Sequence, residues 1–162
     1  MVTLQQFGDS LAGYIGEIKK AQSEAIIRYR CLTFLQTSLG ITLEPSDELE
    51  QRVFHGRTDA TLGSLIFEFK RSLKSSLDAA QDQLRTYLTN LHRQNPNATY
   101  TGIACDGLRF RVYRKTFAID DVSKDTAVVE EVGTLDLEAT TDSSEAFLWL
   151  DSLFAHFRTE RA

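Results

Sequence analysis

The segment that decides the fold reads Leu65-Ile66-Phe67-Glu68-Phe69-Lys70, an apolar run that contains two charged side chains. A second strand-like segment precedes it and reads Asp59-Ala60-Thr61-Leu62. Gly63-Ser64 separates the two, and such a pair between apolar runs is typical of a tight turn. The two segments are therefore predicted to form an antiparallel hairpin.

The charged side chains of this hairpin are expected to meet on one face. Side chains alternate along a strand, so Glu68 and Lys70 point to the same face, and the turn brings Asp59 close to it. Two carboxylates and an ammonium group would then converge. Carboxylate oxygens suit Mg²⁺, which completes its shell with waters and phosphate oxygens, and a lysine beside the metal can orient or deprotonate an attacking water. The spacing alone equally allows a solvated strand face with Asp59 as a turn acid.

Upstream of the hairpin, apolar residues recur at helical spacing from Leu11 to Leu39. Asp9 or Ser10 is expected to cap the start of this helical region, and Gly40 fits the left-handed position that ends a helix. Ser23 could cap a second, separate helix. A further short strand is predicted over 52–55, before the hairpin.

Downstream, leucines and alanines from Leu73 to Leu91 predict a second helix, with Ser72 or Ser75 as its N-cap and a stop at Asn95-Pro96-Asn97. Two strands over 100–104 and 108–113 flank the hairpin signal Asp106-Gly107. Another strand is expected around 127–132, and a last helix from about 142. This order of helix, three strands, helix, two strands and an appended strand and helix predicts an α/β fold, with a mixed central sheet flanked by helices.

Length and composition place the chain among ordinary globular domains. It has 162 residues, of which 42% are hydrophobic, and no apolar run approaches the ~20 residues that a membrane helix needs. We expect a single domain over 1–162, no membrane partner and, in the absence of a signal-like start, a cytoplasmic setting. The net charge is −5, but residues 70–115 carry nine basic and three acidic side chains. An anion could therefore bind on one face while the rest repels it, although chance clustering on solvated faces explains the charges as well.

Taken in order, the motifs resemble the PD-(D/E)xK nuclease superfamily, and most closely the N-terminal nuclease domains of fused restriction–modification proteins. The matching pieces are an early helix with Glu24, Gly56-Arg57-Thr58-Asp59, Glu68-Phe69-Lys70, a QxxxY element at Gln83-Leu84-Arg85-Thr86-Tyr87, and the strand pair over 102–113. Thr58 stands where the family has its name-giving proline. The resemblance implies a restriction-endonuclease-like αβββαβ core over about 10–115, with residues 116–162 as an appended element.

The same resemblance implies the roles of the site residues. Asp59 and Glu68 would bind Mg²⁺, or Mn²⁺ in its place, together with the backbone carbonyl of Phe69, and Lys70 would be the catalytic lysine. Gln83 and Tyr87 would position water or phosphate from one helix face, and Glu24 is a possible further ligand. Arg71, Lys74 and Arg85 would contact DNA phosphates. Glu24 and the three cations could instead be solvated charges, and the Gln83 and Tyr87 pair a boundary of the core.

These residues predict a metal-dependent DNA phosphodiesterase, the cleavage module of a restriction–modification or phage-defence system. The acidic net charge suggests that target recognition resides elsewhere, in a methyltransferase or target-recognition domain or subunit. Cutting both strands needs two sites, so a homodimer is a possible assembly. The alternatives are a catalytically silent binding or scaffold domain with the nuclease fold, and an enzyme that acts on a small phosphorylated substrate.

Overall fold

The computed structural model describes residues 3–40, 60–62, 65–95, 97, 99–116, 128–139 and 142–159. Along the chain the elements are α1 (Leu4–Lys20), α2 (Glu24–Leu39), β1 (Ala60–Leu62), β2 (Leu65–Phe69), α4 (Leu73–Gln94), β3 (Thr101–Cys105), β4 (Arg109–Thr116), β5 (Val128–Asp136) and α5 (Ser143–Thr159). The expected strand over 52–55, the turn at Gly63-Ser64 and the side chain of Asp59 lie outside the described residues.

The strands form one mixed sheet in the order β1-β2-β3-β4-β5. Neighbouring strands are antiparallel except for β2 and β3, which run parallel and are joined by α4. A parallel pair needs such a crossover, since a tight turn can connect only antiparallel strands. Glu68 lies opposite Ala104 and Phe69 opposite Cys105 in the parallel pair. The predicted α/β class with a mixed sheet is confirmed.

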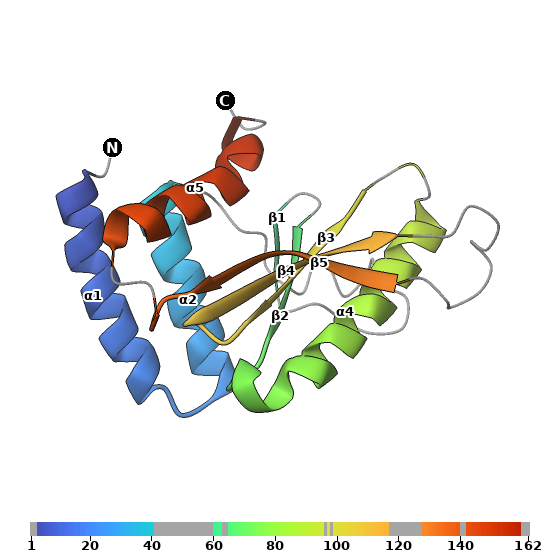
Figure 1. The fold of residues 1–162 in the computed structure, drawn as a ribbon, viewed down its shortest axis with the longest axis horizontal. Coiled ribbons are helices and arrows are strands. Elements are labelled where there is room, and N and C mark those ends of the chain that lie inside the picture. The colour runs from blue at the N-terminus through green and yellow to red at the C-terminus, as the bar shows by residue number, and fades with distance from the viewer. Residues whose placement is uncertain are drawn as a thin grey trace.

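Helices cover both faces of the sheet, and each face has its own apolar cluster (Figure 1). On one face, Phe67, Phe69 and Phe110 pack with side chains of α1, α2 and α5. On the other, Ile66 and Ala104 pack with α4. The C-terminal element belongs to the first cluster, because Ala146, Leu150 and Phe154 of α5 are all completely buried within it. The sheet is thus the middle layer of three.

The first helical region is two helices, and its start differs from the prediction. Thr3 caps α1: its hydroxyl accepts a hydrogen bond from the Gln6 N–H at 3.1 Å, and the Gln6 side chain accepts from the Thr3 N–H at 2.9 Å. The predicted caps Asp9 and Ser10 are wrong, because burial of Phe7 extends the apolar face a full turn towards the N-terminus. Ser23 does cap α2, and Gly40 ends it at φ 65°, as predicted.

Helix α4 begins after Ser72 and ends before Asn95, as the sequence indicates, with a kink at Ser76. Its apolar stripe is buried against the sheet at Ala80, Leu84, Leu88 and Leu91. At its centre Leu84 contacts β3 so closely that a Cβ on Gly102 would lie 2.9 Å from the Leu84 Cδ2 atom. Glycine at this point lets the helix lie directly on the strand.

The predicted strand around 127–132 is β5, which pairs with β4 along its length and has an irregularity opposite Val112 and Tyr113. Among the helices of the described ranges, none combines the length and the apolar character that a membrane crossing requires.

Candidate functional site

A buried ion pair lies where β2 ends. The Lys70 Nζ atom is 3.5 Å from the Glu68 Oε1 atom, and the two side chains are only 16% and 7% exposed. Phe67 and Phe69 point into the opposite cluster. The alternation predicted from the sequence is therefore confirmed: Glu68 and Lys70 share the face that α4 covers. A carboxylate buried to this degree is costly unless a cation compensates it.

The backbone around Lys70 is fixed to the end of β3. The Lys70 N–H donates to the Cys105 carbonyl at 2.9 Å, which continues the pairing of β2 with β3 by one residue. Three positions later, the Leu73 N–H at the start of α4 donates to the Asp106 Oδ2 atom at 2.9 Å. The connection between β2 and α4 is thus held at both ends by consecutive residues, Cys105 and Asp106.

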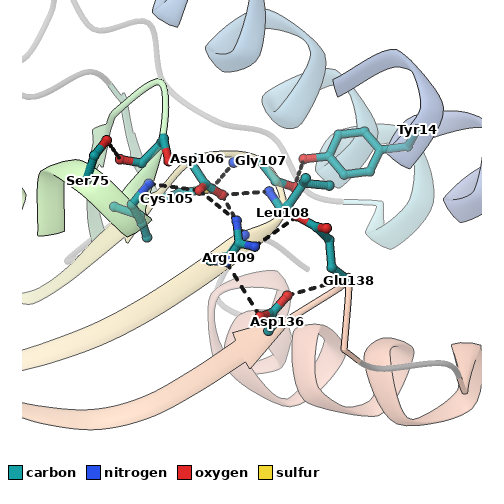
Figure 2. A network of polar contacts seen from close by, with 11 residues as sticks. Tyr14, Ser75, Cys105, Asp106, Gly107, Leu108, Arg109, Asp136 and Glu138 are labelled. Atoms are coloured by element: carbon teal, nitrogen blue, oxygen red, sulfur yellow. Dashed lines mark hydrogen bonds and ion pairs between the residues drawn. The ribbon is translucent and has the colours of Figure 1, made fainter. Parts of the chain in front are cut away.

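Asp106 is the centre of the polar network in Figure 2. Its Oδ1 atom accepts from the backbone N–H groups of Leu108 at 3.0 Å and Arg109 at 2.7 Å. Its Oδ2 atom accepts from Leu73 and also from the Arg109 guanidinium at 3.3 Å. Asp106 therefore shapes the β3–β4 turn and replaces Ser72 as the acceptor at the start of α4, since the Ser72 hydroxyl makes no capping bond.

Arg109 completes this network. It also pairs with Glu138 at 2.8 Å and with Asp136 at 3.5 Å, both from the end of β5 and the turn after it. Burial lowers the pKa of Arg109, but the attraction of Asp106, Glu138 and Asp136 outweighs it, so the pKa lies above its usual value. The charge of Arg109 is therefore permanent, and it ties three segments of the chain together at this end of the sheet.

Gln83 and Tyr87 lie on one flank of α4. They are one turn apart, and Tyr87 packs in the cluster that contains Ile66 of β2. The opposite flank of α4 carries Asp78, whose charge adds to burial and to Glu131 in raising the pKa of Tyr113 on β4. Helical periodicity therefore places Gln83 and Tyr87 on the flank of α4 away from Asp78.

Gln83 holds an orphaned acceptor. Its Oε1 atom is buried and has no hydrogen-bond partner among the residues that the structure describes. Buried polar atoms in folded proteins nearly always have a partner, so an orphaned one calls for a ligand, a water or a functional reason. An amide oxygen with a free lone pair is suited to a metal-bound water or a cation.

The other predicted residues are placed as follows. Glu24 is exposed in the first turn of α2, a helix whose buried side chains pack on the opposite face of the sheet from Glu68. Arg71 and Lys74 are exposed at the start of α4, and Arg85 pairs with Asp82 at 2.9 Å. The role of each of these residues stays a prediction.

The fit of Mg²⁺ depends on the donors at this end of β2. Within the described parts of the chain, no three His, Cys, Asp or Glu side chains lie together as a metal site. The described hard oxygen ligand at this end of β2 is the Glu68 carboxylate, of the kind that Mg²⁺ prefers, and the orphaned Gln83 oxygen is a further one on α4. The second predicted carboxylate, Asp59, lies outside the described residues. Binding of Mg²⁺ at this place therefore stays a prediction.

Two features near the site escape sequence analysis. The thiols of Cys31 in α2 and Cys105 in β3, which look isolated in the sequence, lie 3.8 Å apart in the core. Burial raises the pKa of Cys105 well above its usual value, so this thiol stays neutral. The second feature is the bond from Asp106 to the start of α4. Both contacts join residues far apart in the chain, and neither has a local signal.

The chain was compared with models of protein families, with curated proteins and with solved structures, and each comparison found no match.

Proposed function

We propose that this chain is a Mg²⁺-dependent DNA phosphodiesterase of the PD-(D/E)xK type. The observation that carries the proposal is the Glu68 and Lys70 pair, buried where β2 ends and covered by α4. Charge inside an apolar strand is expensive, and a structural role does not require an acid and a lysine at this position. In a metal-dependent phosphodiesterase both would have a role, the acid as a metal ligand and the lysine beside the attacking water.

The topology around the pair supports the proposal. β1 and β2 form an antiparallel hairpin, α4 crosses over, and β3 returns parallel to β2. This order agrees with the last two strands before the crossover helix and the strand after it in the αβββαβ core that the resemblance implies; the expected first strand, 52–55, lies outside the described residues. The appended strand and helix, β5 and α5, extend the sheet and cover the face opposite α4.

The proposed chemistry follows from the neighbours of the scissile phosphate. A Mg²⁺ ion held by Glu68, Asp59 and the Phe69 carbonyl would supply Lewis acidity to the phosphate and acidity to a bound water. The Lys70 ammonium group would hold the attacking water and offset charge that builds on the phosphate. The Gln83 oxygen would accept a hydrogen bond from that water, and Tyr87 lies on the same flank of α4.

The partners follow from charge. The net charge of −5 opposes tight binding of DNA by this chain alone, while residues 70–115 are basic. We therefore propose that the chain cleaves and that another domain or subunit, such as a methyltransferase or target-recognition unit, selects the DNA. Pairing of two copies would provide the two sites that double-strand cleavage needs.

The proposal is tested by incubating the protein with supercoiled plasmid and Mg²⁺ or Mn²⁺, and by calorimetric titration with each metal. We expect nicking that chelation stops, and metal binding that Asp59→Asn abolishes. If the wild-type chain neither binds metal nor nicks the plasmid, it is a scaffold with a silent site. If it binds metal through Asp59 but leaves the plasmid intact, cleavage of DNA by this chain alone is excluded, and small phosphorylated molecules are the next substrates to test.

Gln83 provides a second prediction. Gln83→Ala should lower the cleavage rate by roughly 10-fold or more, because one hydrogen-bonding group that positions the water is lost. Its melting temperature should be unchanged or slightly higher, since the substitution removes a buried acceptor without a partner. Plasmid nicking and thermal unfolding are the two measurements.

Gln81→Ala is the matched control, because Gln81 is on the same helix but not on the flank of Gln83 and Tyr87. It should cleave at the wild-type rate. Equal rates for both variants would show that the QxxxY element has no part in the chemistry, while leaving the Glu68 and Lys70 assignment intact.

A further inference from the structure

A cavity of about 370 Å³ is lined by residues of α1, of the start of α4 and of the β3–β4 turn. Its wall includes Lys19 from the last turn of α1, Arg71 and Lys74 from the start of α4, and Asp106, Arg109 and Glu138. Figure 2 shows the last three as one connected group. The cavity therefore joins the N-terminal helix to the segment that follows Lys70.

The cations of this cavity differ in how they are neutralised. The two carboxylates in its wall, Asp106 and Glu138, both bind Arg109, at 3.3 and 2.8 Å. Lys19, Arg71 and Lys74 form no ion pair with any residue that the structure describes. Three positive charges without an ion pair among the described residues, from two separate parts of the chain, thus line the same cavity. Such an arrangement attracts an anion.

The position of the cavity indicates which anion it takes. Arg71 directly follows Lys70, but the Lys70 side chain is on the α4 face of the sheet, while Ile18 and Ile27 of the opposite cluster line the cavity. A nucleic-acid strand with one phosphate at Lys70 would therefore reach the cavity with a phosphate further along its backbone. Exposed, flexible cations typically contact DNA through its phosphates, which position the strand without reading its sequence.

We propose that this cavity binds a backbone phosphate of the DNA strand that is cleaved, and that Lys19 of α1 holds it together with Arg71 and Lys74. The inference rests on the proposed DNA phosphodiesterase function and adds α1 to the DNA-contacting surface. Nothing in the motifs of the sequence points to Lys19, because residues of α1 and of the start of α4 line one cavity only in the folded chain.

The test measures binding of a fluorescein-labelled duplex by anisotropy over a series of KCl concentrations, with EDTA present so that no cleavage occurs. Lys19→Ala should weaken binding about fivefold near 0.1 M salt and lower the slope of log K against log[salt] by about one, as expected for one lost phosphate contact. Lys74→Ala should do the same.

Lys20→Ala is the matched control: Lys20 is also exposed in the last turn of α1 but does not line the cavity. It should keep the wild-type slope. If Lys19→Ala also keeps the wild-type affinity and slope, or if Lys20→Ala loses as much as Lys19→Ala, the cavity is not a phosphate site. That result is independent of plasmid nicking: a chain that binds DNA through Lys19 but never nicks it would retain this inference and lose the proposed activity.

Discussion

Lys70→Ala is expected to lower the rate of Mg²⁺-dependent DNA cleavage by roughly 10²–10⁴-fold, the range typical of a positioned group that assists proton transfer or stabilises charge. The reason is geometric: the Lys70 ammonium is the cation 3.5 Å from Glu68, and the Lys70 backbone is anchored to Cys105. Nicking of supercoiled plasmid at saturating Mg²⁺ measures the loss.

Stability has to be measured alongside, because Glu68 loses the Lys70 cation in this variant. The Glu68 side chain is 7% exposed, and removing a cation from a carboxylate buried to this degree is destabilising. Lys70→Arg is the matched variant. It keeps the positive charge and can keep the ion pair, but its planar guanidinium group does not place a donor where the compact ammonium group of lysine holds the water.

The two variants together separate structure from chemistry. We expect Lys70→Arg to unfold like the wild-type chain and to cleave as poorly as Lys70→Ala. Wild-type cleavage by a folded Lys70→Ala would remove Lys70 from the reaction. Full activity in Lys70→Arg alone would reduce its role to that of a fixed positive charge.

The parts of the site that the sequence predicts are those set by local geometry. Alternation along β2 is enough to place Glu68 and Lys70 on one face, and the structure confirms it. Helical periodicity is enough to place Gln83 and Tyr87 on one flank of α4. Helical periodicity does not predict which strand that flank faces, because this depends on the tertiary contact between Leu84 and Gly102.

What the sequence leaves out depends on contacts between distant segments. Asp106-Gly107 predicts a turn, which is present, with Gly107 at φ 89°. Nothing local shows that the same Asp106 accepts from Leu73, 33 residues earlier, or that Cys31 meets Cys105 across 74 residues. The misplaced start of α1 has a related cause: Thr3 and Gln6 form a capping box, and only the burial of Phe7 shows that the helix extends that far.

The largest stability effect is expected from Asp106→Ala. The carboxylate is nearly inaccessible and accepts from three backbone N–H groups and from Arg109. Its removal leaves buried donors without partners in the β3–β4 turn and at the first turn of α4. Losing one member of such a buried charged network costs about 3–5 kcal/mol of the free energy of unfolding. Urea unfolding followed by circular dichroism measures it.

The ion pair of Arg111 and Glu131 serves as the exposed control for the buried pair of Asp106 and Arg109. Arg111 and Glu131 also form a pair at 2.8 Å between neighbouring segments, but their side chains are 34% and 44% exposed. Glu131→Ala should therefore lower the free energy of unfolding by at most about 1 kcal/mol, because solvent screens such pairs.

Asp106→Ala should also slow DNA cleavage, measured without urea at a temperature where the variant is still folded, since the start of α4 is no longer tied to the end of β3. If Asp106→Ala lost no more stability and no more cleavage rate than Glu131→Ala, the turn and α4 would hold Lys70 in place without Asp106.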